Sequence, residues 1–545
     1  MKRVVRSGNA GAQPASPVSL RTPRKQVPER VRGPRAPRRS LVKPGYAQPP
    51  PEAAAELLYR PKTPGSGVLF QVIQRDFATF RSEREAEERP LPRYIEKEFE
   101  AYIRCGVLGH GFVRLKCNGC THEKLLPFSC KKRGFCPSCL GRRMAEASAF
   151  YVDHVLPQAP IRQWVFSFPM PLRFWMAKNP RLLTRILGIS LRTIRSHYQK
   201  KSKRTFALQK PETASLTVVQ RFGGALNLNV HYHSLWVEGV YEEGTDGVVK
   251  FHALSPPTDL EVKQILTRVQ TRIIRALKKE GLLSEVNRSG QIEFILSAPS
   301  DTPDIVEICQ SASILSQIAT GEYAGTRVRR IGSFGHSGED AFLVGPRCAE
   351  LAGFSLHSYT GFAAHQRLEI ERLCRYVMRP PVAESRLAIT SNPNLIHYRF
   401  KRPWSDGTQA VEFTGRELIE KLVALVPPPR AHLVRFHGAL APHSRLRSRV
   451  IPASVTLPSK IDETGEQVQS RPKRRVLSWS ELLKRVFEVD LSICPSCGGT
   501  LKFIAAVVHP SAIRAILEHL GHSTEVPRFA PARAPPRPQE PIWED

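Results

Sequence analysis

The chain has 545 residues, enough for about three or four domains, and its hydrophobic content of 41% is sufficient for folded cores. Its 81 basic and 49 acidic residues give a formal net charge of +32, which favours a polyanionic partner, most simply DNA or RNA. The sequence shows neither a signal-peptide pattern nor an apolar run of bilayer length, so we expect an intracellular protein without a membrane partner. The 11 cysteines are therefore expected to bind metal rather than to form disulfides.

Residues 1–65 form a segment rich in Pro, Arg and Ala, in which Glu29 is the single acid before residue 50. Apolar periodicity is scarce in this segment, so no packed core is expected there. We predict a disordered basic arm that holds phosphate groups without reading a base sequence.

Residues 66–155 contain two C-x2-C knuckles separated by 15 residues, formed by Cys117, Cys120, Cys136 and Cys139. Each knuckle brings two thiolates to one ion, and two knuckles complete the closed tetrahedral shell of a structural zinc site. Four further side chains are close enough in the sequence to compete as ligands: Cys105, Cys130, His110 and His122.

Basic residues surround these knuckles, chiefly Lys131, Lys132 and Arg133. Such charges can simply form a solvated face, but on a rigid zinc module they also suit contacts with phosphate groups. We therefore predict that residues 66–155 form a zinc-binding domain that binds DNA.

A strand is predicted from Leu226 to Val240, and it carries His231 and His233 two residues apart. Side chains at positions i and i+2 of a strand point to the same face, so both imidazoles can reach one divalent metal. Most buried histidines are hydrogen-bonded core residues, and the pair alone does not decide between these two interpretations. Further strands are predicted at residues 164–168 and 215–220.

Helices alternate irregularly with these strands. A capping box at Thr258 and Glu261 begins a helix that should run to about Lys279 and stop at Gly281. Strands are expected at 292–296 and 353–359, followed by a helix over about 365–379 that prolines 380 and 381 end. Without βαβ periodicity, we predict an α+β fold at residues 156–400, an antiparallel sheet with flanking helices, between the zinc-binding domain and a basic C-terminal extension.

The chain after residue 400 is predicted to form three smaller parts: an extension at 401–470, a module at 471–527 and a disordered tail at 528–545. The module contains the sequence Cys494-Pro495-Ser496-Cys497-Gly498-Gly499, which resembles half of a zinc ribbon. No second cysteine pair follows it, so His509, His519 or His522 would have to complete a metal site.

Several motifs in this order resemble one known family. They are Phe128–Cys139, Gln220–His233, Leu373–Pro381, Arg435–Gly438 and Cys494–Gly499. The chain from about residue 70 to 527 is similar to the rolling-circle insertion-sequence transposases of the HUH superfamily (histidine, bulky hydrophobic residue, histidine), in the insertion-sequence-ninety-one-like family. Transposases of this kind cleave single-stranded DNA at element ends.

The resemblance implies that Tyr376 attacks a phosphodiester and forms a 5′-phosphotyrosine, assisted by Mg²⁺ or Mn²⁺ on His231 and His233. A free phenol ionises near pH ~10, so the nucleophile needs a cation, a metal or a base at neutral pH. Arg375 and Arg379 flank the tyrosine and are expected to contact DNA. Some family members have a second tyrosine four residues earlier, where this chain has Arg372, so we expect the single-tyrosine branch.

A two-histidine site needs a third ligand. Gln220, on the preceding predicted strand, is the first choice and His357 the second, although either can instead be a structural hydrogen-bonding residue. We expect single-stranded element ends and target DNA as partners, a homodimer as the assembly, and the bacterial cytoplasm beside the nucleoid as the location.

Three alternatives compete with a transposase. A replication initiator or relaxase would use the same nicking chemistry on a replicon origin, a metal-dependent nuclease would use water with Tyr376 as a structural residue, and a non-catalytic zinc protein would only bind DNA. The zinc module that precedes the histidine strand favours the transposase.

Overall fold

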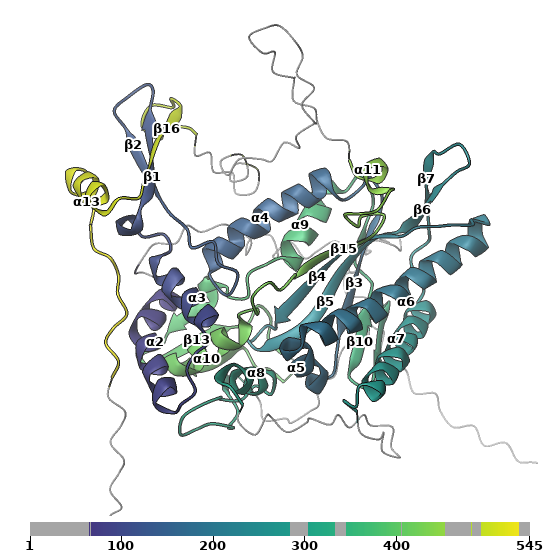
Figure 1. The fold of residues 1–545 in the computed structure, drawn as a ribbon, viewed down its shortest axis with the longest axis horizontal. Helices are drawn as coiled ribbons and strands as arrows, with labels where there is room; N and C mark the ends of the chain where they lie inside the picture. Colours follow the sequence, from purple (N-terminus) through teal and green to yellow (C-terminus); the bar gives the residue numbers. More distant parts are fainter. Residues whose placement is uncertain are drawn as a thin grey trace, which may run out of the picture. The chain divides into compact units, whose positions relative to one another are not determined.

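The computed structural model describes residues 67–283, 303–332, 345–404, 406–452 and 492–533, together with the single residues 65, 481 and 485. The predicted basic arm and the predicted strand at 292–296 lie outside the described residues. All strand pairs given below are antiparallel, and helices pack against the sheets, which confirms the predicted α+β class (Figure 1). Within the part of the chain that the structure describes, no helix is long and apolar enough to cross a membrane.

The N-terminal region begins with two helices and continues into a small sheet. Its elements are α2 (Val68–Ala86), α3 (Arg93–Arg104), η1 (Leu108–His110), β1 (Phe112–Cys117), β2 (Glu123–Pro127) and α4 (Pro137–His154). Strand β1 pairs with β2 on one side and with β16 (Leu501–Val507) on the other. A strand from near the end of the sequence thus completes the N-terminal sheet, which the predicted separation of a C-terminal module did not anticipate.

The central sheet has the strand order β15-β4-β5-β3-β10-β9, with β11 also paired to β3. These strands are β3 (Ile161–Ser167), β4 (Ala214–Phe222), β5 (Leu228–Val237), β9 (Cys348–Leu351), β10 (Phe354–His357), β11 (Gly361–Phe362) and β15 (Val434–Gly438). Strand β5 lies between β4 and β3, so the backbone is hydrogen-bonded along both of its edges. Strand β15 pairs with β4 although it lies beyond the predicted end of this domain at residue 400.

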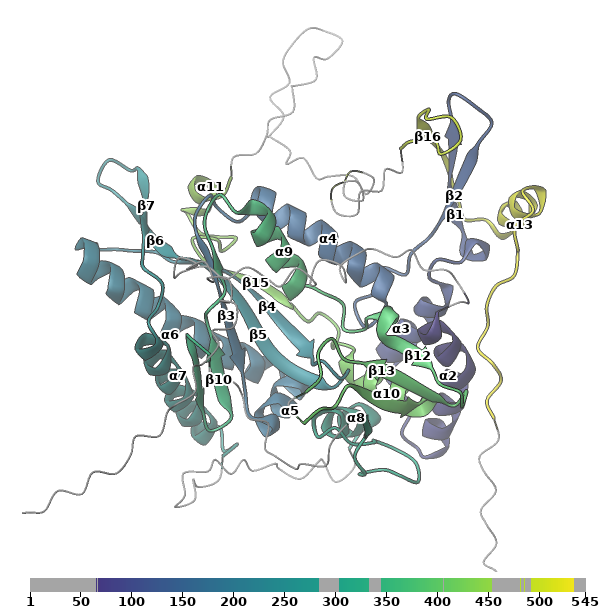
Figure 2. The ribbon, with the colours of Figure 1, turned by 180° about the vertical axis from the view of Figure 1, so that it is seen from behind.

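Different helices cover the two faces of the central sheet (Figures 1 and 2). One face packs on α5 (Met170–Lys178), α6 (Pro180–Phe206) and α7 (Asp259–Lys279), and the other packs on α4 and α9 (Arg367–Val377). Strand β5 alternates accordingly, because Tyr232 and Trp236 point to the α6 face and Leu235 and Val237 to the α9 face. The odd-numbered positions, which include both histidines, therefore belong to the α9 face.

The predicted helix starts and stops agree with the structure where local chemistry sets them. Helix α7 begins after Thr258, whose side chain and that of Glu261 form the predicted capping box. Gly281, just beyond the helix, has a φ of +68°, which suits glycine at a helix end. Helix α9 ends at Val377, just before Pro380.

A second sheet of four strands lies beside α2 and α8 (Ile305–Ile314). It has the order β12-β13-β14-β8 and is formed by β8 (Arg329–Ile331), β12 (Leu387–Ile389), β13 (Leu395–Arg399) and β14 (Ala410–Thr414). Helix α10 (Gly415–Leu425) packs between α2 and α8 and buries nearly all of its length. The remaining elements are β6 (Gly239–Glu243), β7 (Val249–Ala253), η2 (Glu384–Arg386), α11 (Arg447–Val450) and α13 (Pro510–His519).

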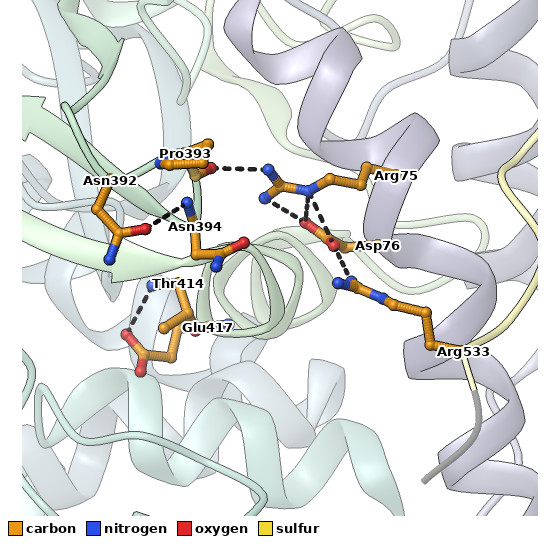
Figure 3. A network of polar contacts seen from close by, with 8 residues as sticks. All are labelled: Arg75, Asp76, Asn392, Pro393, Asn394, Thr414, Glu417 and Arg533. Atoms are coloured by element: carbon orange, nitrogen blue, oxygen red, sulfur yellow. Dashed lines mark hydrogen bonds and ion pairs between the residues drawn. The ribbon is translucent and has the colours of Figure 1, made fainter. Parts of the chain in front are cut away.

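The last described residues lie along α2, where the sequence predicted a disordered tail. The backbone N–H of Ala530 donates to the Gln74 carbonyl at 2.8 Å, and that of Arg533 donates to Thr79 Oγ1 at 3.1 Å. Figure 3 shows Arg533 beside Asp76, which Arg75 also contacts while it donates to the Pro393 carbonyl. This proline-rich segment forms no helix or strand, but its backbone and side chains still find partners on α2.

Candidate active site and cysteine clusters

The two predicted metal-binding histidines lie side by side on the α9 face of the central sheet. Their Nε2 atoms are 3.1 Å apart, and both side chains are buried. The residue between them, Tyr232, points to the opposite face, where its hydroxyl donates to the Leu183 carbonyl at 3.0 Å. Anchoring Tyr232 in the α6 core fixes the strand register that holds both imidazoles on one face.

The hydrogen bonds of the outer ring nitrogens orient both imidazoles. His231 Nδ1 lies 2.9 Å from the Asn229 carbonyl, which can only accept, so this nitrogen carries the proton and Nε2 keeps its lone pair. His233 Nδ1 lies 2.7 Å from Nε2 of the Gln163 side-chain amide on β3. An amide nitrogen can only donate, so this orientation would leave Nδ1 as the acceptor. With the amide flipped, Oε1 of Gln163 would accept the Nδ1 proton and leave the second Nε2 free for a metal.

Burial keeps both imidazoles neutral, as metal ligands must be. Desolvation is the main cause that lowers the pKa of His231, to about 4, with a further contribution from the charges of Arg379 and Arg173. Desolvation also lowers the pKa of His233 well below its usual value, and His231 and Arg379 add to that shift. Both ring systems are therefore uncharged at neutral pH.

The predicted nucleophile lies at the edge of this pair. The ring of Tyr376, on the last turn of α9, meets that of His233 edge-on, with centroids 5.9 Å apart and planes at 87°. Its side chain is 43% exposed, whereas its neighbours Leu373 and Val377 are buried in the core. Arg379 lies over the tyrosine ring at 4.4 Å from the centroid. The structure thus brings Tyr376, Arg379 and the histidine pair together.

Gln220 is the better placed of the two predicted third ligands. It lies opposite His231 in the β4–β5 register, and its amide donates to the Val377 carbonyl at 2.6 Å. Its Oε1 atom is buried and has no hydrogen-bond partner among the described residues. His357 lies two strands away, opposite Val165, which separates its backbone from β5 by about 10 Å.

A cleft of about 500 Å³ adjoins this site between α4, β4, β15 and the end of α9. Its lining includes Gln220 and four arginines, Arg133, Arg143, Arg221 and Arg379. A second cleft of about 450 Å³ shares Arg221 with the first and adds Arg181, Arg430 and Arg435. Among the residues that the structure describes, no acidic side chain lines either cleft. Both clefts are therefore positively charged, and the larger one reaches Arg379 just beyond the end of α9.

The predicted DNA-binding residues occupy different environments. Lys131 and Arg133 are exposed, and Arg133 lines the larger cleft, whereas Lys132 lies with Cys130 in a separate hollow beside α3. Arg375 is half-buried, and desolvation lowers its pKa. The structure therefore places Arg379 and Arg133, but not Lys132, along the cleft.

Eight of the eleven cysteines form two clusters in the structure, and these divide the predicted zinc ligands differently. The first cluster unites Cys105, Cys130, Cys136 and Cys139, with all sulfur atoms within 4.8 Å of one another. The Cys130 and Cys139 sulfurs are 3.2 Å apart, and the Cys105 sulfur lies 3.6 Å from that of Cys139. Hydrogen bonds from Cys105, Cys130 and Cys136 lower the pKa of Cys139, so the cluster stabilises a thiolate.

The second cluster unites Cys117 and Cys120 with Cys494 and Cys497, again within 4.8 Å. The predicted single site of Cys117, Cys120, Cys136 and Cys139 is therefore corrected. The physical reason is the pairing of β1 with β16. It brings the knuckle of Cys494 and Cys497, the late knuckle, next to that of Cys117 and Cys120, the early knuckle. His509, His519 and His522, the predicted partners of the late knuckle, belong to neither cluster.

Three residues of these sites, Cys105, Cys130 and Gln163, could not be singled out from the sequence, for two different reasons. Cys105 and Cys130 were weighed only as substitutes, because they stand outside the C-x2-C pattern. Gln163 escaped notice, because its importance depends on the β3–β5 register, which brings it diagonally next to His233. Its position one residue before the predicted strand at 164–168 was the one available signal.

Comparison with known proteins agrees with this arrangement. Residues 215–448 match a family model described as "Putative transposase", and residues 72–168 match one described as "Transposase zinc-binding domain". The two segments together span more than half of the chain and contain the histidine pair, Tyr376 and the whole first cysteine cluster. The chain therefore belongs to the family of transposases with this zinc-binding domain, as the sequence resemblance indicated.

A similar individual protein is the "Transposase for insertion sequence element IS801" of Pseudomonas savastanoi pv. phaseolicola. It is 21% identical over 411 residues, which cover 74% of this chain and 82% of the relative. No solved structure matches the chain significantly.

Proposed function

We propose that this transposase cleaves single-stranded DNA at the ends of its element by attack of Tyr376. The observation that carries the proposal is the contact between the ring of Tyr376 and His233, whose Nε2 atom faces that of His231 at 3.1 Å. A half-exposed phenol beside two buried neutral imidazoles provides a nucleophile and metal ligands at one place.

The residues present fit a divalent metal. His231 and His233 offer two neutral nitrogens, and the unpartnered Oε1 of Gln220 offers an oxygen near the same strand register. Among the described residues, no group of three or more His, Cys, Asp or Glu side chains includes either histidine. We therefore expect weak binding of Mg²⁺ or Mn²⁺, which DNA phosphate would strengthen. The bound ion would stabilise negative charge on the scissile phosphate.

The protein's own groups then account for strand transfer. The Tyr376 oxygen bonds to phosphorus, the bond from phosphorus to the 3′ oxygen breaks, and the phenolic proton ends on the released 3′-hydroxyl. Arg379, over the tyrosine ring, places a permanent positive charge beside the phenol. Because one phosphoester replaces another, a 3′-hydroxyl can reverse the step and restore the tyrosine without a nucleotide cofactor.

The basic clefts suit the DNA strand that must reach the tyrosine. Arg133, Arg143 and Arg221 line the larger one, and contacts of this kind fix a phosphate backbone without reading bases. Single-stranded ends, target DNA, a homodimer and a location beside the bacterial nucleoid stay predictions that accompany this proposal.

Trapping the covalent intermediate tests the proposal. Wild-type protein, Tyr376→Phe and Tyr359→Phe are incubated with labelled single strands from the ends of the element, with Mn²⁺. Tyr359 is the matched control, because it is also partly exposed, at 37%, and also lies near an arginine, Arg347. We expect denaturant-resistant adducts for the wild type and Tyr359→Phe and none for Tyr376→Phe.

Retention of the adduct in Tyr376→Phe would refute the assignment. Cleavage by the wild type without any adduct would instead indicate a nuclease that uses water. Binding of the labelled strands by Tyr376→Phe, measured in parallel, excludes loss of folding as the cause.

A further inference from the structure

We propose that Cys117, Cys120, Cys494 and Cys497 bind a second structural zinc ion, which joins the C-terminal part of the chain to its N-terminal domain. This site is distinct from the cluster of Cys105, Cys130, Cys136 and Cys139. The segment matched by the zinc-binding family model, residues 72–168, holds every ligand of the first cluster but only half of the second. The inference is independent of the proposed cleavage chemistry.

The sulfur geometry supports a tetrahedral ion. The Cys117 sulfur lies 3.5 Å from that of Cys497, and the Cys120 sulfur lies 3.7 Å from that of Cys494. Each contact joins one cysteine of the early knuckle to one of the late knuckle, and all four sulfurs lie within 4.8 Å. Four thiolates without an open position form the usual shell of a structural zinc.

The two knuckles also share the backbone features that thiolate ligands need. The Gly119 N–H points to the Cys117 sulfur at 3.3 Å, and the Gly499 N–H points to the Cys497 sulfur at 3.4 Å. Hydrogen bonds of this kind stabilise the negative charge of the ligands. A Cβ atom on Gly499 would lie only 3.1 Å from the Cys117 sulfur, so a larger residue there would crowd the contact between the two knuckles.

Strand pairing brings the knuckles into register. Strand β1 ends at Cys117, whose backbone lies opposite Leu501 at the start of β16. The Asn118 N–H donates to the Thr500 carbonyl at 3.0 Å, directly beside both knuckles. Leu501 and Leu115 pack with Cys117 and Cys494 and shield one side of the sulfur cluster from water. The site is therefore part of the folded sheet.

The remaining C-terminal contacts are modest without the metal. Helix α13 adds Ile513 and Leu517 to a small core with Phe112, and Phe529 packs on Phe77 at 5.0 Å between ring centroids. An ion that closes a loop of some 380 residues removes much conformational freedom from the unfolded chain. We therefore expect zinc at this site to hold residues 492–533 in place.

Metal analysis of the full-length protein tests this inference. We expect two zinc ions per chain in the wild type, one in Cys494→Ser/Cys497→Ser, and two in the control Cys309→Ser/Cys348→Ser, which alters cysteines outside both clusters. Two ions in the first double variant, or one in the wild type, would overturn the proposal.

A second measurement on the wild-type sequence guards against misfolding of the variant. Alkylation with peptide mapping should find Cys117, Cys120, Cys494 and Cys497 protected together and exposed together when a chelator removes one zinc. Disulfides joining Cys117 to Cys497 and Cys120 to Cys494, or independent alkylation of the late pair, would contradict a shared ion. Neither measurement depends on DNA cleavage, so failure here leaves the Tyr376 proposal standing.

Discussion

Each cysteine cluster gathers four thiols within 4.8 Å, whereas the histidine pair on β5 has, among the described residues, no acidic or third histidine partner within that distance. The thiol sets are complete, so a metal there has no position left for a substrate. The histidine set is incomplete, and its neighbours are an exposed tyrosine and an arginine-lined cleft. A complete ligand set stabilises a fold, whereas an incomplete one leaves room for DNA.

Removal of a histidine should give the largest effect on activity. His231→Ala or His233→Ala should lower the rate of strand cleavage by about 10³-fold or more, since a metal at the phosphate contributes several kcal/mol. A cleavage assay with labelled single strands measures this loss, and zinc content should stay unchanged. The control His357→Ala should cleave normally. If His357→Ala is as inactive as His231→Ala, then His357 and not Gln220 completes the site.

Removal of one thiol should chiefly affect stability. Cys136→Ser in the buried first cluster should lower the free energy of unfolding by about 4 kcal/mol or more, because metal binding and folding are coupled there. Denaturant unfolding and zinc analysis measure both effects. Cys309→Ser, which is equally buried but outside the clusters, should cost at most about 2 kcal/mol. Equal losses in the two variants would mean that the cluster holds no structural metal.

Those features of the histidine site and of the cysteine clusters that depend on local patterns could be predicted from the sequence. Strand alternation placed His231 and His233 on one face, and the capping box at Thr258 and the prolines after Arg379 located helix ends. The grouping of the cysteines failed, because the spacing rule pairs knuckles that are close in the sequence. The partner of Cys117 and Cys120 is set by the pairing of β1 with β16, which no local pattern encodes.

Domain boundaries were harder to predict for the same reason. Strand β15 joins the central sheet from beyond the predicted boundary at residue 400. Its place beside β4 depends on a long-range pairing, which a local sequence pattern does not reveal. Gln163 was missed, since its contact with His233 arises only across the β3–β5 register.

A change at Gln163 should give an intermediate effect and shows whether the histidines need an orienting partner. Gln163→Leu should lower cleavage about 10- to 100-fold at fixed Mn²⁺, because His233 loses its second hydrogen bond. Gln163→Glu, whose carboxylate can accept the proton of Nδ1, should retain most activity. Titration with Mn²⁺ separates weaker metal binding from a packing defect. Equal losses in both variants, unaffected by Mn²⁺, would indicate packing alone.

The smallest effect is expected for the cleft. Arg143→Ala should weaken binding of single-stranded DNA severalfold and reduce the slope of log affinity against log salt by about 1, since one phosphate contact is lost. Binding titrations over a range of salt concentrations measure this. The control is Arg195→Ala, an exposed arginine that pairs with Glu212 away from the clefts. An unchanged slope in Arg143→Ala would exclude this cleft as the path of the DNA.

The pairing of β1 with β16 also has a consequence in time. Cys117 and Cys497 are 380 residues apart, so at a synthesis rate of about 5 to 20 residues per second the early knuckle waits about 20 to 75 s for its partner. During that interval β1 has one unpaired edge, which a strand from another chain can occupy. A copy of the gene truncated before residue 494 would leave that edge open permanently, and its product would be prone to aggregation.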